Sequence, residues 1–213
     1  MATNYNLLIT SEKNLKKMVA EFLEFSYTTH EKLWKYIFRA DDGHKIIDSI
    51  AVRVKEAEQK ERDLVDECIW TISKDDPRAN HLRFIISIIY SAKDIAIATN
   101  YSLTISKTFV RKEINKAHID MIKDLSKSYL DLLQRYIKIY KDKKIKDIFD
   151  ETEKMYAEFI ELSHEAMKGI RKELTNEDSE LLYFPISQIV KSMEGTVERV
   201  KSVFANAVSK EIS

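Results

Sequence analysis

The stretch "KDDPRANHLRFIISIIYSAKDIAIATN", residues Lys74–Asn100, decides the fold class. Its first residues predict a helix start, because Asp76 can cap an exposed backbone N–H and the ring of Pro77 suits the first helical position. Apolar residues then recur at spacings of three and four, which predicts an inward-facing stripe of Ile85, Ile86, Ile89 and Ala92. We therefore expect a long helix that starts at Asp76–Pro77 and contacts more than one neighbour.

The rest of the chain has the same helical character. Its 213 residues include only 3 Gly and 2 Pro, and β-sheet proteins of this length normally need far more turn residues. The few breaks lie at Asp41–Gly43, at the charged run "KDKKIKD" of residues 141–147, and at Thr175–Asp178, which is a close variant of a capping box. These features predict an all-α protein.

The two halves of the chain follow one plan. Each contains two charged amphipathic segments followed by a longer, more apolar one, which indicates an internal repeat of about half the chain. Short connections make neighbouring helices antiparallel. We predict two tandem three-helix bundles, residues 1–108 and 109–213, built from six long antiparallel helices.

The composition excludes several classes of protein. The 35 Lys and Arg residues balance 35 Asp and Glu residues, which argues against nonspecific nucleic-acid binding. No apolar run approaches the roughly 20 residues that cross a bilayer, and the first residues lack a secretion signal. We expect a soluble, cytoplasmic protein without membrane insertion. Cys68 is the only cysteine, which favours a buried or half-buried thiol over a reactive one.

Catalytic patterns are absent from the sequence. Glu161 and His164 have the spacing of a di-iron ligand pair, but no second such pair exists, and the core stripe around Phe159 and Leu162 places both on the outer side of their helix. The remaining histidines have no nucleophile arranged beside them, which favours isolated, solvated or locally bonded roles for His30, His44, His81 and His118. The lack of a Gly-rich phosphate loop argues against nucleotide hydrolysis. Together these patterns predict no enzymatic activity.

The third helical segment resembles a known signature. "DDPRANHLRFIISIIYSAKDI" is similar to the third helix of the PhoU family of phosphate-uptake regulators, where D-P-x-A-x-D-L-R leads into D-L-E-R-I-G-D. The matching residues are Asp76, Pro77, Ala79, Leu82, Arg83 and Asp94. In the second half, "MEGTVERVKSVFANAV" matches through Glu198, Arg199 and Asn206. The six-helix layout resembles the family over essentially the full length.

The resemblance also implies a metal motif, which this sequence has largely replaced. The family carries E-x-x-x-D on the third helix of each half, and such carboxylates one turn apart can hold iron, zinc or magnesium-type ions. Here Ala96 and Asn100 align with the first pair, and Glu198 and Ser202 align with the second. One carboxylate of four remains. We expect no resident metal, or weak divalent or iron-type binding through Glu198 and Asp94.

The resemblance implies a non-enzymatic regulator of phosphate uptake and phosphate-responsive signalling. Its partners would be the ATPase subunit of a phosphate ABC importer and, where present, a sensor histidine kinase, and it would form a homodimer. The candidate partner-binding residues are Asp76, Arg78, Arg83 and Arg199. Two alternatives stay open. One is a metal-binding or metal-sensing protein that adds Glu56 or Asp66 to the residual carboxylates, and the other is a dimeric helical scaffold.

Overall fold

The computed structural model of the chain describes residues 2–39, 43–111, 114, 120, 122–141, 146–173 and 179–208. These residues form six long helices and no strand, which confirms the predicted all-α fold. The helices are α1 (Ala2–Arg39), α2 (Gly43–Asp75), α3 (Asn80–Arg111), α5 (Lys123–Lys141), α6 (Lys146–Glu173) and α7 (Ser179–Val208). The break predicted at residues 141–147 separates α5 from α6, whereas the cap predicted at 175–178 lies outside the described residues.

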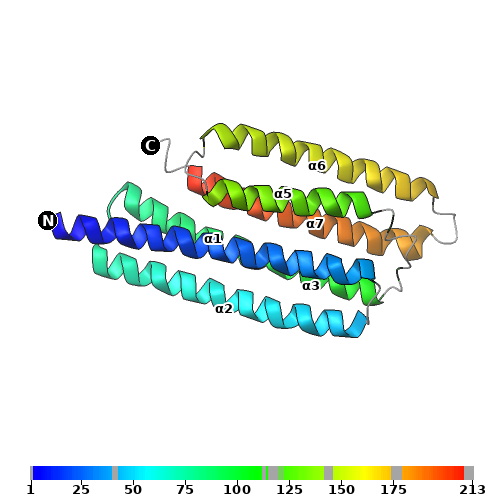
Figure 1. Ribbon diagram of the computed structural model, residues 1–213, viewed down its shortest axis with the longest axis horizontal. Coiled ribbons are helices and arrows are strands. Elements are labelled where there is room, and N and C mark those ends of the chain that lie inside the picture. The colour runs from blue at the N-terminus through cyan, green and yellow to red at the C-terminus, as the bar shows by residue number, and fades with distance from the viewer. Residues whose placement is uncertain are drawn as a thin grey trace.

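The helices lie along the long axis of an elongated molecule, with α1 to α3 on one side and α5 to α7 on the other (Figure 1). Consecutive helices run in opposite directions. The most extensive contact between two helices joins α3 to α7, and α1 also contacts α5. Residues 108 and 109, on either side of the predicted domain boundary, both belong to α3, which continues to Arg111. The contacts of α3 with α7 and of α1 with α5 thus join the two groups of helices side by side.

A glycine allows a close approach between α3 and α7. A Cβ atom at Gly195 of α7 would lie 2.8 Å from the ring of Tyr101 on α3. Carbon atoms in ordinary contact are about 3.5–4.0 Å apart, so any larger side chain at this position would displace the ring. Gly195 therefore leaves the space that the Tyr101 ring fills at this contact.

The connection between α2 and α3 differs from the sequence-based prediction. α3 begins at Asn80, so the helix start predicted at Asp76–Pro77 is wrong. The φ angles of Asp76 and Ala79 are 44° and 49°, in the left-handed region that commonly follows a helix C-terminus. Asp is among the residues that tolerate this conformation, so Asp76 ends α2 and does not cap α3.

The core extends through both groups of helices, and most of the predicted α3 stripe lies in it. Ile85 and Ala92 are completely buried, and Ile89 is half-buried. Ile86 is 40% exposed, so the prediction that it faces inward is wrong. α3 is packed against α1, α2 and α7. Ile86 lies on the remaining side of the helix, since each residue turns by about 100°.

His30 of α1 lies in the core between the two groups of helices. Its Nε2 atom is 2.9 Å from the carbonyl oxygen of Ala98 on α3, and its ring meets the edge of the Tyr129 ring of α5 at a centroid distance of 5.5 Å. Because a carbonyl only accepts hydrogen bonds, Nε2 carries the hydrogen. Burial lowers the pKa of His30 to about 4, and the bond to Ala98 offsets only part of that effect. Of the isolated, solvated or locally bonded roles predicted for the histidines, a solvated role is wrong for His30, and its bond partner is 68 residues away.

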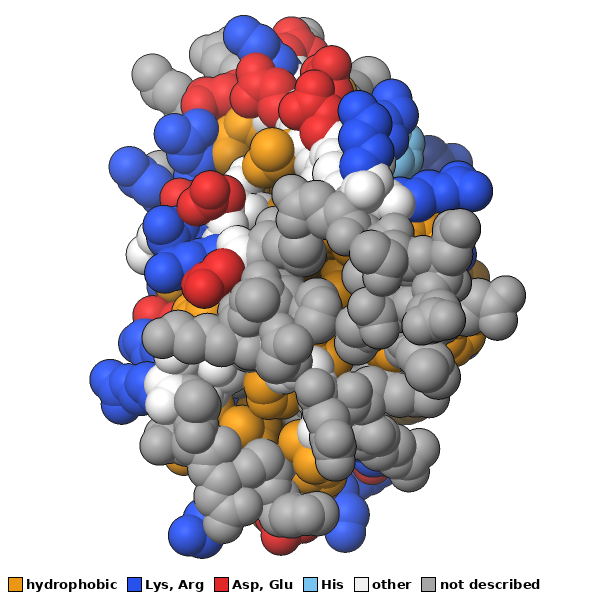
Figure 2. All heavy atoms as spheres, turned by 90° about the vertical axis from the view of Figure 1, so that its right-hand side faces the viewer, with side chains coloured by type: hydrophobic (Ala, Val, Ile, Leu, Met, Phe, Trp, Pro, Cys, Tyr) orange, Lys and Arg blue, Asp and Glu red, His pale blue; other side chains and the backbone are white. Residues whose placement is uncertain are grey.

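The outer surface mixes both charges. Figure 2 shows the end of the molecule where α1, α3 and α6 finish, and acidic and basic side chains are interspersed around its described rim. Across the described residues, no helix combines the length and the apolar character that crossing a bilayer requires.

The buried His30 predicts a specific loss of stability in acid. The unfolded chain binds a proton at His30 near pH 6.5, whereas the folded chain binds it only near pH 4. The free energy of unfolding should therefore fall as the pH drops from about 6.5 to 4, with His30 contributing about 3 kcal/mol of the loss between pH 7 and 4. Urea unfolding across this range should show a smaller loss for His30→Gln than for the wild type. The exposed residue His164 provides the control, since His164→Gln should keep the wild-type acid dependence. Equal slopes for His30→Gln and wild type would contradict the assignment.

Candidate functional site

One ion pair connects the third helices of the two halves. Nη1 of Arg199 on α7 lies 2.9 Å from Oδ1 of Asp94 on α3. The Asp94 side chain is 12% exposed and the Arg199 side chain 45% exposed, so water screens this pair only in part. The hydrogen bond to Asp94 raises the pKa of Arg199, which keeps the guanidinium charged. The structure thus brings together two residues predicted for different roles, a metal ligand and a partner-binding residue.

The motif positions of α3 lie away from this ion pair. Ala96 is half-buried and Asn100 is exposed. At about 100° per residue, both lie on roughly the opposite side of α3 from Asp94, whose carboxylate faces α7. The residual carboxylate Asp94 and the motif positions Ala96 and Asn100 therefore do not converge on one point.

The motif positions of α7 lie toward α6. Glu198 is exposed and Ser202 is half-buried. The ammonium group of Lys201 lies 2.7 Å from a carboxylate oxygen of Glu153 and 4.2 Å from the centre of the Tyr156 ring, both on α6. Burial, followed by the charge of Glu198, raises the pKa of Tyr156. A lysine ammonium is thus the cation that the carboxylate of Glu153 binds here.

The described residues do not fit a resident metal ion. Ala96 offers no ligand atom, Asn100 and Ser202 offer neutral oxygens, and Asp94 is engaged by Arg199. Nowhere in the described ranges do three or more His, Cys, Asp or Glu side chains gather as metal ligands. A hard cation needs several oxygen ligands, carboxylates among them, so Glu198 alone is insufficient. The further ligands considered from the sequence, Glu56 and Asp66, are exposed on α2.

The α2–α3 tip, residues 75–81, is held against α1 by two polar contacts. Ser11 donates a hydrogen bond to Asp75 at 2.8 Å, and the His81 ring lies 2.9 Å from a carboxylate oxygen of Glu12. At the exposed turn itself, Nη2 of Arg78 lies 3.3 Å from Oδ2 of Asp76. The predicted partner-binding residues Asp76 and Arg78 therefore project from a fixed tip. Arg83 is exposed on the first turn of α3.

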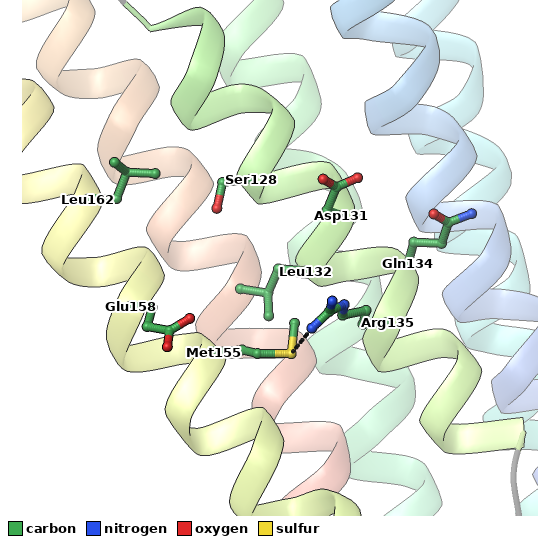
Figure 3. A pocket seen from close by; sticks show the side chains of 8 residues that line it. All are labelled: Ser128, Asp131, Leu132, Gln134, Arg135, Met155, Glu158 and Leu162. Carbon is green, nitrogen blue, oxygen red and sulfur yellow. Dashed lines mark hydrogen bonds between the residues drawn. The ribbon is translucent and has the colours of Figure 1, made fainter.

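A groove of about 710 Å³ runs between α5 and α6. Figure 3 shows Leu132 and Arg135 of α5 directed toward Met155 of α6, and Nη1 of Arg135 lies 3.3 Å from the Met155 sulfur. Glu158 adds a carboxylate to the rim. The described lining includes neither His nor Cys, so the groove offers no imidazole or thiol, and its charged groups are those of Asp131, Arg135 and Glu158.

Other residues considered in the sequence have structural or surface roles. Glu161 and His164 are exposed, as predicted. Cys68 is buried, and burial raises the pKa of its thiol to about 12, which makes it unreactive. The side chains of His44 and His118 lie outside the described residues.

The contact between Lys201 and Tyr156 was not predictable from the sequence. These two residues are 45 positions apart and belong to different helices, and no local pattern links them. Lys201, Glu153 and Tyr156 form this cluster from two different amphipathic helices. Their association is recognisable only after the two helices are packed together.

Comparison with known sequences finds two related proteins of mycoplasmas, and no protein-family model matches the chain. The uncharacterized protein MG409 of Mycoplasma genitalium is 33% identical over 106 residues, which are 49% of this chain and 47% of that protein. Its homolog in Mycoplasma pneumoniae is 32% identical over 120 residues, 55% of this chain and 52% of that protein. The chain thus spans about half the length of the curated relatives it matches.

Comparison with solved structures identifies the fold. The phosphate transport system regulatory protein PhoU of Streptococcus pneumoniae superposes with a TM-score of 0.74 at 14% identity, over 96% of both chains. PhoU of Pseudomonas aeruginosa superposes with a TM-score of 0.61 at 11% identity, over 99% of this chain and 98% of that one. The chain therefore has a PhoU-like fold, which confirms the fold that the sequence resemblance implied.

The ion pair between Asp94 and Arg199 should stabilise the contact between the two halves. Replacing Arg199 by Gln leaves the mostly buried Asp94 carboxylate without its partner, so we expect a loss of about 1–2 kcal/mol in the free energy of unfolding. In a double-mutant cycle followed by urea unfolding, Asp94→Asn should cost much less in the Arg199→Gln background than in the wild type. The exposed pair of Arg135 and Glu151 is the control, and its coupling should stay below about 0.5 kcal/mol. Additive effects of Asp94→Asn and Arg199→Gln would refute the stabilising role.

Proposed function

Because the chain has a PhoU-like fold over nearly its whole length, we propose that it is a non-enzymatic, cytoplasmic regulator of phosphate uptake and phosphate-responsive signalling. It acts by binding the ATPase subunit of a phosphate importer and, where one is present, a sensor histidine kinase. The superposition on 96% of the Streptococcus pneumoniae protein is the observation that carries this proposal. That protein is a phosphate transport system regulatory protein, and the regulatory role is transferred from it by analogy.

The surface of the molecule suits a binding role. Long, rigid helices present charged outer faces, and complementary charge selects partners and speeds association. The tip around Arg78 is fixed to α1 through Ser11 and Glu12, so a partner that docks there meets a preorganised surface. The described groove between α5 and α6 is lined by both apolar and charged side chains, which suits a surface that acts through contacts.

The same proposal covers assembly and metal content. In this proposal the regulator works as a homodimer, as the sequence resemblance to the PhoU family implies, and without a resident metal. The neutral motif positions Ala96, Asn100 and Ser202 and the engagement of Asp94 by Arg199 support metal-independent action. They count against the alternative of a metal-sensing protein, since among the described residues no three His, Cys, Asp or Glu side chains gather as ligands.

Binding to the importer tests the proposal directly. Purified protein should form a complex with the ATPase subunit of its own organism's phosphate importer, with a dissociation constant of about 10 µM or tighter by calorimetry. The ATPase subunit of an unrelated importer provides the matched control and should not bind. Arg78→Glu should weaken the complex, because it reverses a charge on the rigid tip, whereas Lys154→Glu on α6 should not. No binding, or equal binding to both ATPase subunits, would rule out the proposed regulator.

Metal content tests the proposal that the protein acts without a resident metal. Protein purified without chelator and then offered iron, zinc and magnesium should hold less than about one-tenth of an equivalent after desalting, because one free motif carboxylate cannot replace a hydration shell. Elemental analysis of Glu198→Gln should give the same value. Binding near one equivalent that Glu198→Gln abolishes would show that the metal-bearing alternative is correct.

A further inference from the structure

The outward side of α3 carries a continuous stripe of apolar and basic residues. Ile86 and Tyr90 are 40% and 61% exposed, and Ile97 one heptad beyond Tyr90 is half-buried. Between and beside them lie the exposed bases Arg83, Lys93 and Lys107. The first five of these positions, 83 to 97, follow spacings of three and four, so they form one line along the helix, which position 107 continues. We call these six residues the α3 seam.

The seam lies on the side of α3 that no other described helix covers. The helix contacts α1, α2 and α7, and residues such as Ile85, Ala92 and Ile95 that face these neighbours are completely buried. An aliphatic and an aromatic side chain thus lie one turn apart on the open side of a helix that is otherwise packed on three sides. Apolar positions at heptad spacing are the pattern by which one helix recognises another.

The charge of the seam is of one sign. Asp94 is the only acidic residue of α3, and its carboxylate faces α7 and binds Arg199. Asn100, which aligns with a motif carboxylate of the PhoU family, lies in the same stripe as a neutral amide. The seam therefore presents apolar anchors flanked by bases and no carboxylate, although the whole chain has a formal net charge of zero.

We propose that the α3 seam is a docking surface for an amphipathic helix of a partner protein, with apolar anchors and acidic flanking residues. The anchors pack on Ile86, Tyr90 and Ile97, and the acids pair with the bases beside them, which supplies both affinity and orientation. A second copy of this chain fits poorly, because two facing seams would place bases opposite bases. The proposal deepens the proposed function, on which it rests for the existence of a partner.

The test uses two labelled helical peptides that differ only in charge. Both carry Leu at the a and d heptad positions, and the remaining positions are mainly Glu in one peptide and mainly Lys in the other. In fluorescence anisotropy, the full-length protein should bind the Glu peptide at least about tenfold more tightly than the Lys peptide. Tyr90→Ser and Lys93→Glu should each lower the affinity for the Glu peptide by about tenfold. A higher salt concentration should also lower the affinity of the wild-type protein for the Glu peptide.

Two exposed residues outside the seam provide matched controls. Trp70 on α2 is 51% exposed, so Trp70→Ser removes an aromatic side chain of similar exposure to Tyr90. Lys154→Glu reverses an exposed charge on α6. Both should leave peptide binding within about twofold of the wild type, and circular dichroism should show every variant folded.

Three outcomes would overturn the proposal. The first is equal binding of the two peptides, and the second is an effect of Trp70→Ser as large as that of Tyr90→Ser. The third is failure of the Glu peptide to bind while phosphatidylglycerol vesicles bind in a Tyr90-dependent way, which would make the seam a membrane-surface contact. If the importer ATPase binds and the seam variants do not affect it or the peptide, the seam proposal fails and the regulator proposal stands. If the peptide binds as expected and the importer ATPase does not bind, the regulator proposal fails and the seam proposal stands.

Discussion

The packing of α3 against α7 is the contact on which the rest of the structure depends. It is the most extensive contact between two helices, and it joins the first group of helices to the second. Gly195 lets the Tyr101 ring lie against α7, and the ion pair of Asp94 and Arg199 connects the same two helices. Because each of these helices also packs against the other two helices of its own group, this contact, together with the smaller one between α1 and α5, sets how the two halves of the molecule are oriented.

The same contact explains what happened to the charged positions of the two central helices. Asp94, a candidate metal ligand in the sequence, serves as the partner of Arg199 between the halves. On the other side of α7, Lys201 binds Glu153 and lies over Tyr156. Fixed cationic side chains thus neutralise carboxylates beside both third helices. Side-chain cations therefore occupy positions beside these carboxylates that a bound metal ion would otherwise compete for.

The sequence predicted much of the fold and little of the site. Scarcity of Gly and Pro, apolar spacing of three and four, and the charged break before α6 were sufficient for an all-α protein with six long helices. The α2–α3 connection was harder, because Pro is common both at the first position of a helix and just after a helix end, and Asp can adopt the left-handed conformation that follows an end. In the structure the left-handed φ of Asp76 ends α2, and α3 starts only at Asn80.

The sequence by itself determined which segments become helices and that their motif positions carry few carboxylates, because propensity, spacing and residue type are local properties. Only the tertiary structure decided which side of each helix is covered. It exposed Ile86, which the local pattern places inside, and it buried His30 beside a carbonyl group 68 residues away. Burial depends on which other helices are nearby, and that depends on contacts between residues far apart in the chain, which a single sequence does not reveal.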